Sequence, residues 1–119
     1  MTFKQLAVRA RRVRELYAAA EIQRTGRPWS PSELAQGFAG DVGQLMKLVM
    51  AKAGRRVSQT RNLDEALAHE LSDCLWSVLV LADAYHVDLE RAFNHTMNEL
   101  EQRLTPRRRT KTARSVRGR

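Results

Sequence analysis

Four side chains in two short acidic patterns have the types and the spacing needed to bind a metal ion. Asp41 and Gln44 are three residues apart, and so are Glu70 and Asp73. Each pair lies in a run whose apolar residues recur at helical spacing, so its two members share one face of a helix, one turn apart. If the two helices pack side by side, three carboxylates and one amide oxygen can converge. Carboxylates held this close repel one another without a cation, so the pattern predicts Mg²⁺ or Mn²⁺, which take oxygen ligands.

Long helices are needed to carry these patterns, and the composition of the chain favours them. The 119 residues suffice for one domain, 43% of them are apolar, and the helix breakers Gly (6) and Pro (3) are scarce. We therefore expect an all-α fold. The helices are expected over residues 3–24, 31–53, 63–85 and 89–104. Helices this long leave little room for a closed core in so short a chain, so a partner chain is expected to help bury their apolar faces.

Capping signals set the boundaries of these helices. Ser30 can cap the second helix, with Pro31 at its first position and Glu33 placed to bond back to the cap. Asn62 is the expected cap of the third helix, with Glu65 placed to close a similar box. The remaining signals are Gly54 at the end of the second helix, Asp88 as the cap of the fourth, and Pro106 as its stop.

The apolar stripes predict which faces of the two central helices are buried. The second helix has an expected stripe of Leu34, Phe38, Val42, Leu45 and Val49. Asp41 and Gln44 flank this stripe and are therefore expected to be poorly solvated. The third helix has an expected stripe of Leu67, Leu71, Cys74, Leu75, Val78, Leu81, Ala82 and Tyr85. From residue 74 to residue 82 only Ser77 is polar, which predicts burial nearly all round, with a second subunit on one side.

The net charge of +8 belongs to the end of the chain. Seven Lys and Arg residues and no acids lie between Arg107 and Arg119, which leaves residues 1–106 with 14 basic and 13 acidic groups. The body is nearly neutral, which weakens any interpretation of the folded domain as a nucleic-acid binder. Residues 106–119 are expected to form a disordered basic tail after an all-α domain of residues 1–105. Such a tail either keeps the protein in solution or contacts RNA or DNA through phosphate charge.

Cysteine usage and hydropathy indicate a cytoplasmic protein. Cys74 is the only cysteine, so no disulfide can form within the chain, and its apolar surroundings suggest a small buried hydrophobe. No leading apolar segment suggests secretion, and no run of about 18 apolar residues could span a bilayer. The three histidines show no ligand spacing with one another or with Cys74, and each is expected at the surface or at a helix cap.

Several polar and aromatic positions allow two interpretations. The arginines on one face of the first helix and those of residues 55–61 either face solvent or neutralise the phosphates of a ligand; those of the helix are Arg9, Arg11, Arg12 and Arg14. Trp29 either packs against the helix that follows it or stacks on a nucleotide base. Glycines at positions 37, 40 and 43 weaken a helix by roughly 0.5–1 kcal/mol each relative to alanine. They suggest that a neighbouring helix or a ligand approaches the backbone there.

Four segments within residues 29–104 resemble the MazG-like nucleotide pyrophosphohydrolases, an all-helical superfamily that includes dimeric dUTPases and dCTP pyrophosphatases. Residues 30–35 resemble the lead-in to the first acidic helix of the family. Residues 40–45 are similar to its Glu-Val-Gly-Glu-Leu segment, and residues 70–76 to its Glu-Leu-Ala-Asp-Val-Leu-Trp segment. Residues 82–92 resemble the turn that opens its last helix. The resemblance implies a four-helix MazG-like bundle that is completed by dimerisation.

The resemblance also implies an activity and a set of site residues. Members of the family split a nucleoside triphosphate between the α and β phosphates, with Mg²⁺ ions held by four acidic residues. Carried over by position, the catalytic residues would be Asp41, Glu70 and Asp73. The metal ligands would be these three carboxylates with Gln44 at the fourth place.

Departures from the family pattern bear on this activity. Asp41 stands where the family has Glu, which shortens the side chain by one methylene. Gln44 also replaces a Glu, and a neutral amide oxygen binds Mg²⁺ more weakly than a carboxylate does. The last helix of the family commonly carries a Lys and, four residues later, an Asn. Thr96 and Leu100 occupy those two places.

Three functions follow as hypotheses. The first is a house-cleaning Mg²⁺-dependent pyrophosphohydrolase that converts a nucleoside triphosphate to a monophosphate and pyrophosphate, acting as a homodimer or homotetramer. The second is a catalytically degenerate scaffold that binds nucleotides or supports oligomerisation. The third is a protein that associates with nucleic acid through its basic tail. None of the three involves a membrane.

Overall fold

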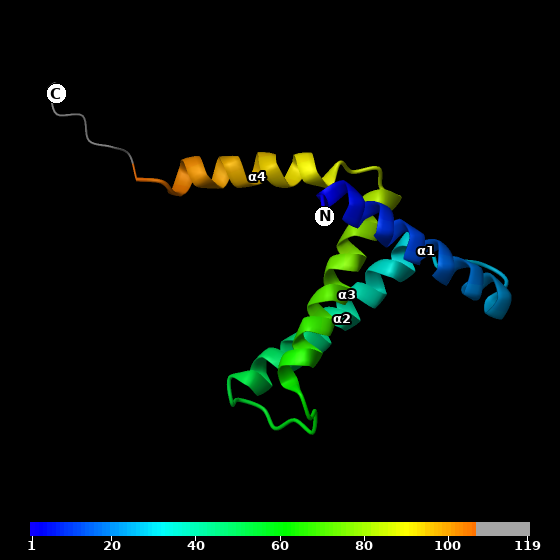
Figure 1. Cartoon of the computed structure of the whole chain (residues 1–119), viewed down its shortest axis with the longest axis horizontal. Coiled ribbons are helices and arrows are strands. Elements are labelled where there is room, and N and C mark those ends of the chain that lie inside the picture. Colours follow the sequence, from blue (N-terminus) through cyan, green and yellow to red (C-terminus); the bar gives the residue numbers. More distant parts are fainter. Residues whose placement is uncertain (107–119) are drawn as a thin grey trace, which may run out of the picture. The chain divides into compact units, whose positions relative to one another are not determined.

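The computed structural model describes residues 1–106 and contains four α-helices (Figure 1). They are α1 (Phe3–Thr25), α2 (Pro31–Lys52), α3 (Leu63–Ala84) and α4 (Leu89–Leu104). No strand occurs among residues 1–106, so the expectation of an all-α fold is confirmed. A basic tail is expected over residues 106–119, and residues 107–119 of it lie outside the part of the chain that the structure describes.

Side-chain caps start α2 and α3 where the sequence predicts them. The Ser30 hydroxyl accepts a bond from the Glu33 N–H (3.2 Å), and the Glu33 carboxylate accepts one from the Ser30 N–H (2.9 Å). The Asn62 side chain accepts from the Glu65 N–H (3.0 Å). The box at Asn62 does not close as expected, because the Glu65 carboxylate bonds to the Asn62 side-chain amide (3.2 Å) and not to its backbone. After α2 the chain turns through Gly54 at φ 74°, a left-handed conformation that glycine adopts without strain.

The helices α2 and α3 lie side by side, and α1 packs against α3 (Figure 1). The buried apolar core is small and consists of Ala10, Leu34, Leu79 and Val80. Trp76 fixes α3 to α1, because its indole N–H donates to the Ala10 carbonyl (3.1 Å) and its ring meets Tyr17 edge-on at 5.5 Å between centroids. These contacts hold the three helices in one arrangement.

The buried stripe of α2 differs from the expected one at Asp41 and Val42. Val42 and Val49 are exposed, whereas Asp41 and Leu48 are half-buried. A stripe through Leu34, Asp41 and Leu48 also has helical spacing, and it is this stripe that faces α3. Asp41 therefore lies within the buried stripe and not at its border.

The stripe of α3 shifts in the same way. Leu71, Leu75 and Tyr85 are about half-exposed, although the pattern predicts them as buried. Ser77, the one polar residue of its apolar run, is only 6% exposed. The face that carries Glu70, Asp73 and Ser77 is thus the face turned inward.

Large apolar side chains remain on the outer surfaces of α2 and α3. They are Val42, Met46, Val49, Met50, Leu71 and Leu75. No large side chain among residues 1–106 is fully buried. The expectation that a partner chain covers such faces stays a prediction, and these side chains identify the surface that the partner would cover.

The chain divides into two compact units, of which the first is Met1–Leu89 and the second begins at Glu90. The second unit contains nearly all of α4, which has an apolar side formed by Phe93, Met97, Leu100 and Leu104 and no buried residue. Within the described residues, no helix is both long enough and apolar enough to cross a membrane.

Candidate functional site

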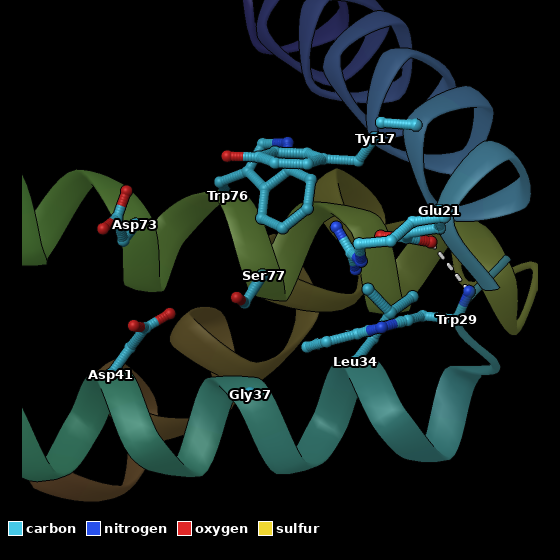
Figure 2. Close-up of a pocket in the computed structure, with 11 residues that line it drawn as sticks. Tyr17, Glu21, Trp29, Leu34, Gly37, Asp41, Asp73, Trp76 and Ser77 are labelled. Carbon is cyan, nitrogen blue, oxygen red and sulfur yellow. Dashed lines mark hydrogen bonds between the residues drawn. The ribbon is translucent and has the colours of Figure 1, made fainter.

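The candidate site lies between α2 and α3, and two of the three acids predicted to converge line it. Asp41 of α2 and Asp73 of α3 line one pocket, as Figure 2 shows. Cys74 is influenced by both helices: partial burial raises the pKa of its thiol, and the negative charges of Asp41, Glu70 and Asp73 raise it further. Carboxylates of both helices therefore influence Cys74, and two of them, Asp41 and Asp73, share the pocket.

Glu70 and Asp73 form the centre of this acidic cluster. Together with His69, each offers one ligand atom, and the three atoms lie within 4.8 Å of one another. The Glu70 Oε2 is buried, and no described residue donates a hydrogen bond to it. A buried carboxylate oxygen without a donor is costly, and a bound cation would satisfy it. The donor set and this unpartnered oxygen therefore fit a divalent ion.

His69 is a member of the cluster that sequence reasoning placed at the surface. Its side chain is indeed exposed, but its Nε2 lies 3.1 Å from the Asp73 Oδ2. The signal for this contact is the i, i+4 spacing of His69 and Asp73, which puts the two side chains on one face of α3. His69 is thus a fourth polar group beside the acids.

Gln44, the fourth ligand that the resemblance implies, lies elsewhere. It is exposed, and it is not among the residues that line the pocket. The inward face of α2 passes through Asp41 and Leu45, and Gln44 projects beside it. Within the described residues Asp41 and Asp73 line one pocket, Glu70 clusters with Asp73 and His69 on α3, and Gln44 belongs to neither group.

The pocket has a volume of about 370 Å³ and is lined by three helices and the α1–α2 turn (Figure 2). Its lining residues are Tyr17, Ala20, Glu21, Arg24, Trp29, Leu34, Gly37, Asp41, Asp73, Trp76 and Ser77. Carboxylates thus share the cavity with three aromatic side chains and one arginine. Such a mixture suits a ligand with a planar ring and a charged group.

Arg24 and Ser77 are pocket residues that the sequence did not single out. Among the described residues, no hydrogen bond or ion pair holds the Arg24 guanidinium, so its charge is available to a ligand. The Ser77 hydroxyl also lacks a hydrogen bond there, although the residue is 94% buried. The only sequence signal for Ser77 is its polarity within an apolar run.

Several arginines of α1 have partners within the protein, which favours structural roles for them. Arg11 pairs with Asp83 (3.0 Å), and Arg14 pairs with Glu21 (3.1 Å). The loop arginines 55, 56 and 61 are exposed. Of the basic groups in the described chain, Arg24 is the one that lines the acidic pocket.

The three glycines of α2 do not share one cause. A Cβ on Gly37 would lie 3.2 Å from the Trp29 ring, a tight contact that an alanine could make only if the ring shifted by a few tenths of an ångström. Gly40 and Gly43 have open space where a Cβ would be. At Gly37 the Trp29 ring of the preceding turn approaches the backbone, whereas no described residue does so at Gly40 or Gly43, where the approach of a ligand stays a prediction.

Comparison with known families agrees with this architecture of facing acidic helices. The model of the MazG nucleotide pyrophosphohydrolase domain matches residues 30–107, which is more than half of the chain. The chain therefore belongs to the MazG nucleotide pyrophosphohydrolase family. Membership implies a nucleotide substrate and, as is typical of the family, a divalent metal. Neither the search of curated proteins nor the search of solved structures returned a match.

The matched residues include α4 and the two positions that depart from the family pattern. Thr96 is exposed and Leu100 is half-buried on this helix. Both belong to the second unit, whereas the residues that line the pocket all belong to the first.

Proposed function

We propose that this protein is a cytoplasmic nucleoside triphosphate pyrophosphohydrolase that requires Mg²⁺ or Mn²⁺. The reaction would add water to the triphosphate and release a nucleoside monophosphate and pyrophosphate. The observation that carries the proposal is that Asp41 of α2 and Asp73 of α3 line one pocket with aromatic side chains, while Glu70 lies beside Asp73. Family membership supports the same class of reaction.

Asp41, Glu70 and Asp73 are the proposed metal ligands and catalytic residues, and Gln44, which does not line the pocket, is proposed as a weaker ligand. The buried and unpartnered Glu70 Oε2 supports a cation at this place. When bound, a divalent ion would neutralise phosphate charge and lower the pKa of the water it holds. The carboxylates would hold the ion, and their position on two packed helices would fix the ligand geometry.

The other pocket residues are assigned to the rest of the nucleotide. The unpaired Arg24 guanidinium suits the negative charge of the phosphates. Trp29, Tyr17 and Trp76 offer aromatic surface to the base. The half-buried position of the acids limits the access of bulk water, which strengthens their interaction with a cation.

Pyrophosphate release from a panel of ribo- and deoxyribonucleoside triphosphates, with Mg²⁺ or Mn²⁺, tests the proposal. Asp73→Asn should reduce turnover by at least about 100-fold, the scale of losing one group that stabilises a transition state. Asp64→Asn is the matched control, because Asp64 is an exposed acid of the same helix that pairs with Lys52 outside the pocket. Folded wild-type protein that releases no pyrophosphate with any nucleotide would refute the enzymatic function.

The exposed position of Gln44 favours a specific second outcome, in which the chain binds nucleotides without hydrolysing them. A metal site that lacks the charge of one family carboxylate would hold its ion more weakly. Binding without turnover would identify a degenerate scaffold. Gln44→Glu should then strengthen Mg²⁺ binding, as measured by calorimetry.

A further inference from the structure

A buried ion pair lies on α1, and its Glu21 lines the same pocket as Asp41 and Asp73. The Arg14 Nη1 lies 3.1 Å from the Glu21 Oε1, and the two side chains are only 16% and 9% exposed. Burying two charges is unfavourable unless further hydrogen bonds satisfy them. The remaining bonds of this pair therefore indicate what it holds in place.

Both members of the pair bind the backbone of Trp29. The Glu21 Oε1 accepts a hydrogen bond from the Trp29 N–H, and the Arg14 Nη2 donates one to the Trp29 carbonyl, each at 2.7 Å. These are short, charge-assisted bonds, which are the strong ones. They hold a residue of the α1–α2 turn, which lies outside any helix. The backbone of Trp29 is therefore fixed from both sides by buried charges.

The side chain of Trp29 is also held, and it borders the pocket. Its Cζ3 lies 3.2 Å from the place a Cβ of Gly37 would occupy, so the ring rests on the backbone of α2. Figure 2 shows the indole extending from the turn along α2 toward the cavity. The residue is nevertheless 40% exposed, which leaves part of the ring open to a ligand.

We propose that Arg14 and Glu21 are positioning residues that hold Trp29 as the wall on which the nucleobase of the substrate stacks. This inference rests on the proposed nucleotide pyrophosphohydrolase function. A planar base of any kind can stack on an indole. The unpartnered Ser77 hydroxyl in the same pocket would provide a hydrogen-bonding group for the base or sugar. The aromatic end would thus bind the nucleoside, and the acidic end the phosphates.

Calorimetric titrations of the full chain with two ligands, in the presence of Mg²⁺, distinguish binding at the aromatic end of the pocket from binding at the acidic end. The first is a set of nucleoside triphosphates with an imido bridge between the α and β phosphates, which cannot be cleaved there. The second is inorganic tripolyphosphate, which carries the phosphates without a base. A change confined to the base wall should weaken binding of the first ligand and leave the second unchanged.

Trp29→Leu should weaken nucleotide binding by roughly 5- to 100-fold, the worth of one base stacked on an aromatic side chain. Trp29→Phe should restore most of the affinity. Glu21→Gln should cost about fivefold or more, because it removes the charge that pairs with Arg14 and holds the Trp29 N–H. Arg14→Gln is the second test of this clamp, the pair of Arg14 and Glu21 that holds Trp29, if Glu21→Gln does not fold. Arg27→Gln is the matched control, since it breaks the exposed Arg27–Glu33 pair (2.7 Å) of the same turn without touching Trp29.

Gly37→Ala distinguishes a role of Trp29 in nucleotide binding from a purely structural role, because the two roles predict different effects on affinity and on melting temperature. The added methyl group should shift the Trp29 ring by a few tenths of an ångström and so weaken nucleotide binding. Alanine also favours the helix and should maintain or raise the melting temperature. Gly40→Ala adds a methyl group to the same helix in open space and should leave the affinity for both ligands unchanged.

The outcomes distinguish the two levels of the proposal. If neither ligand binds in the presence of Mg²⁺, the proposed function itself is wrong. If both ligands bind, and folded Trp29 and Glu21 variants bind nucleotides as the wild type does, the clamp has only a structural role. Equal weakening of nucleotide and tripolyphosphate would also overturn the inference, because it would place the effect at the phosphate end.

Discussion

At the scale of single residues, the surroundings of Glu70 are unfavourable for a carboxylate in the absence of a cation. Its Oε2 is buried without a donor, and its carboxylate lies beside that of Asp73. Like charges at such a distance oppose each other, and an unsatisfied buried oxygen adds to the cost. Both costs disappear when a divalent ion binds.

This balance leads to a prediction for Glu70→Gln. Without metal, the variant should be more stable than the wild type by about 1–2 kcal/mol, because it removes one of the repelling charges. Thermal unfolding in EDTA and in saturating Mg²⁺ measures both effects. The wild type should gain about 2.7 kcal/mol when Mg²⁺ is present at 100 times its Kd, and the variant should gain much less. An equal gain in both proteins would show that Glu70 does not bind the ion.

Asp41 provides a second residue-scale prediction, because its helix faces that of Glu70 and Asp73. Asp41→Ala should reduce nucleotide turnover by at least about 100-fold and weaken Mg²⁺ binding, since it removes the one carboxylate that α2 contributes. Steady-state pyrophosphate release and metal titration measure the two effects. Gln36→Ala, an exposed change on the same helix, is the control. If the Asp41→Ala protein is active, the proposed metal site lies on α3 alone.

At the scale of elements, the cap of α2 depends on a carboxylate with a strongly shifted pKa. The Arg27 guanidinium, followed by the Ser30 N–H, lowers the pKa of Glu33 from its ordinary 4.5 to about 2. A carboxylate with a lowered folded-state pKa stabilises the fold fully above its unfolded value, and this contribution is lost as the pH falls through the folded value.

Glu33→Gln should therefore be less stable than the wild type at pH 6, and the difference should shrink between about pH 4.5 and pH 2. Urea unfolding at several pH values within this window measures the difference directly. A difference that stays constant with pH would show that the charge of Glu33 does not contribute to the cap.

Local signals in the sequence were enough to predict the elements. Ser30 and Asn62 cap their helices through bonds to residues three positions later, and such bonds depend on sequence spacing alone. The choice between adjacent apolar stripes could not be made in this way. On α2, the stripes through Val42 and through Asp41 both have helical spacing, and only the packing against α3 decides between them.

The candidate site was predictable to the extent that it depends on one helix face. The i, i+3 spacing of Glu70 and Asp73 indicates a shared face, and a second acidic helix completes the cluster. The aromatic end was not predictable in the same way, because it depends on contacts between α1 and the turn. Arg14 and Glu21 resemble ordinary surface charges in the sequence, and only the fold reveals that they are buried.

At the scale of the whole molecule, the outer faces of α2 and α3 leave large apolar side chains exposed. Leu71 and Leu75 of α3 are 52% and 48% exposed, and α2 exposes Met46 and Val49 beside its inward stripe. Burying one leucine side chain contributes about 1.5–3 kcal/mol. Leaving several such side chains in water forgoes a large part of the stability that a small domain can obtain. A homodimer or homotetramer that uses these faces would recover it.

Leu75→Glu tests this assembly, because a charge placed in an apolar interface loses its hydration without gaining a partner. Analytical ultracentrifugation should show the wild type as a dimer or tetramer and the variant as a species of lower mass. Val57→Glu is the control, since Val57 is 93% exposed on the α2–α3 loop. A wild-type protein that sediments as a monomer at all concentrations would refute the assembly. If the Leu75→Glu protein keeps the wild-type mass, the interface lies on another face of the molecule.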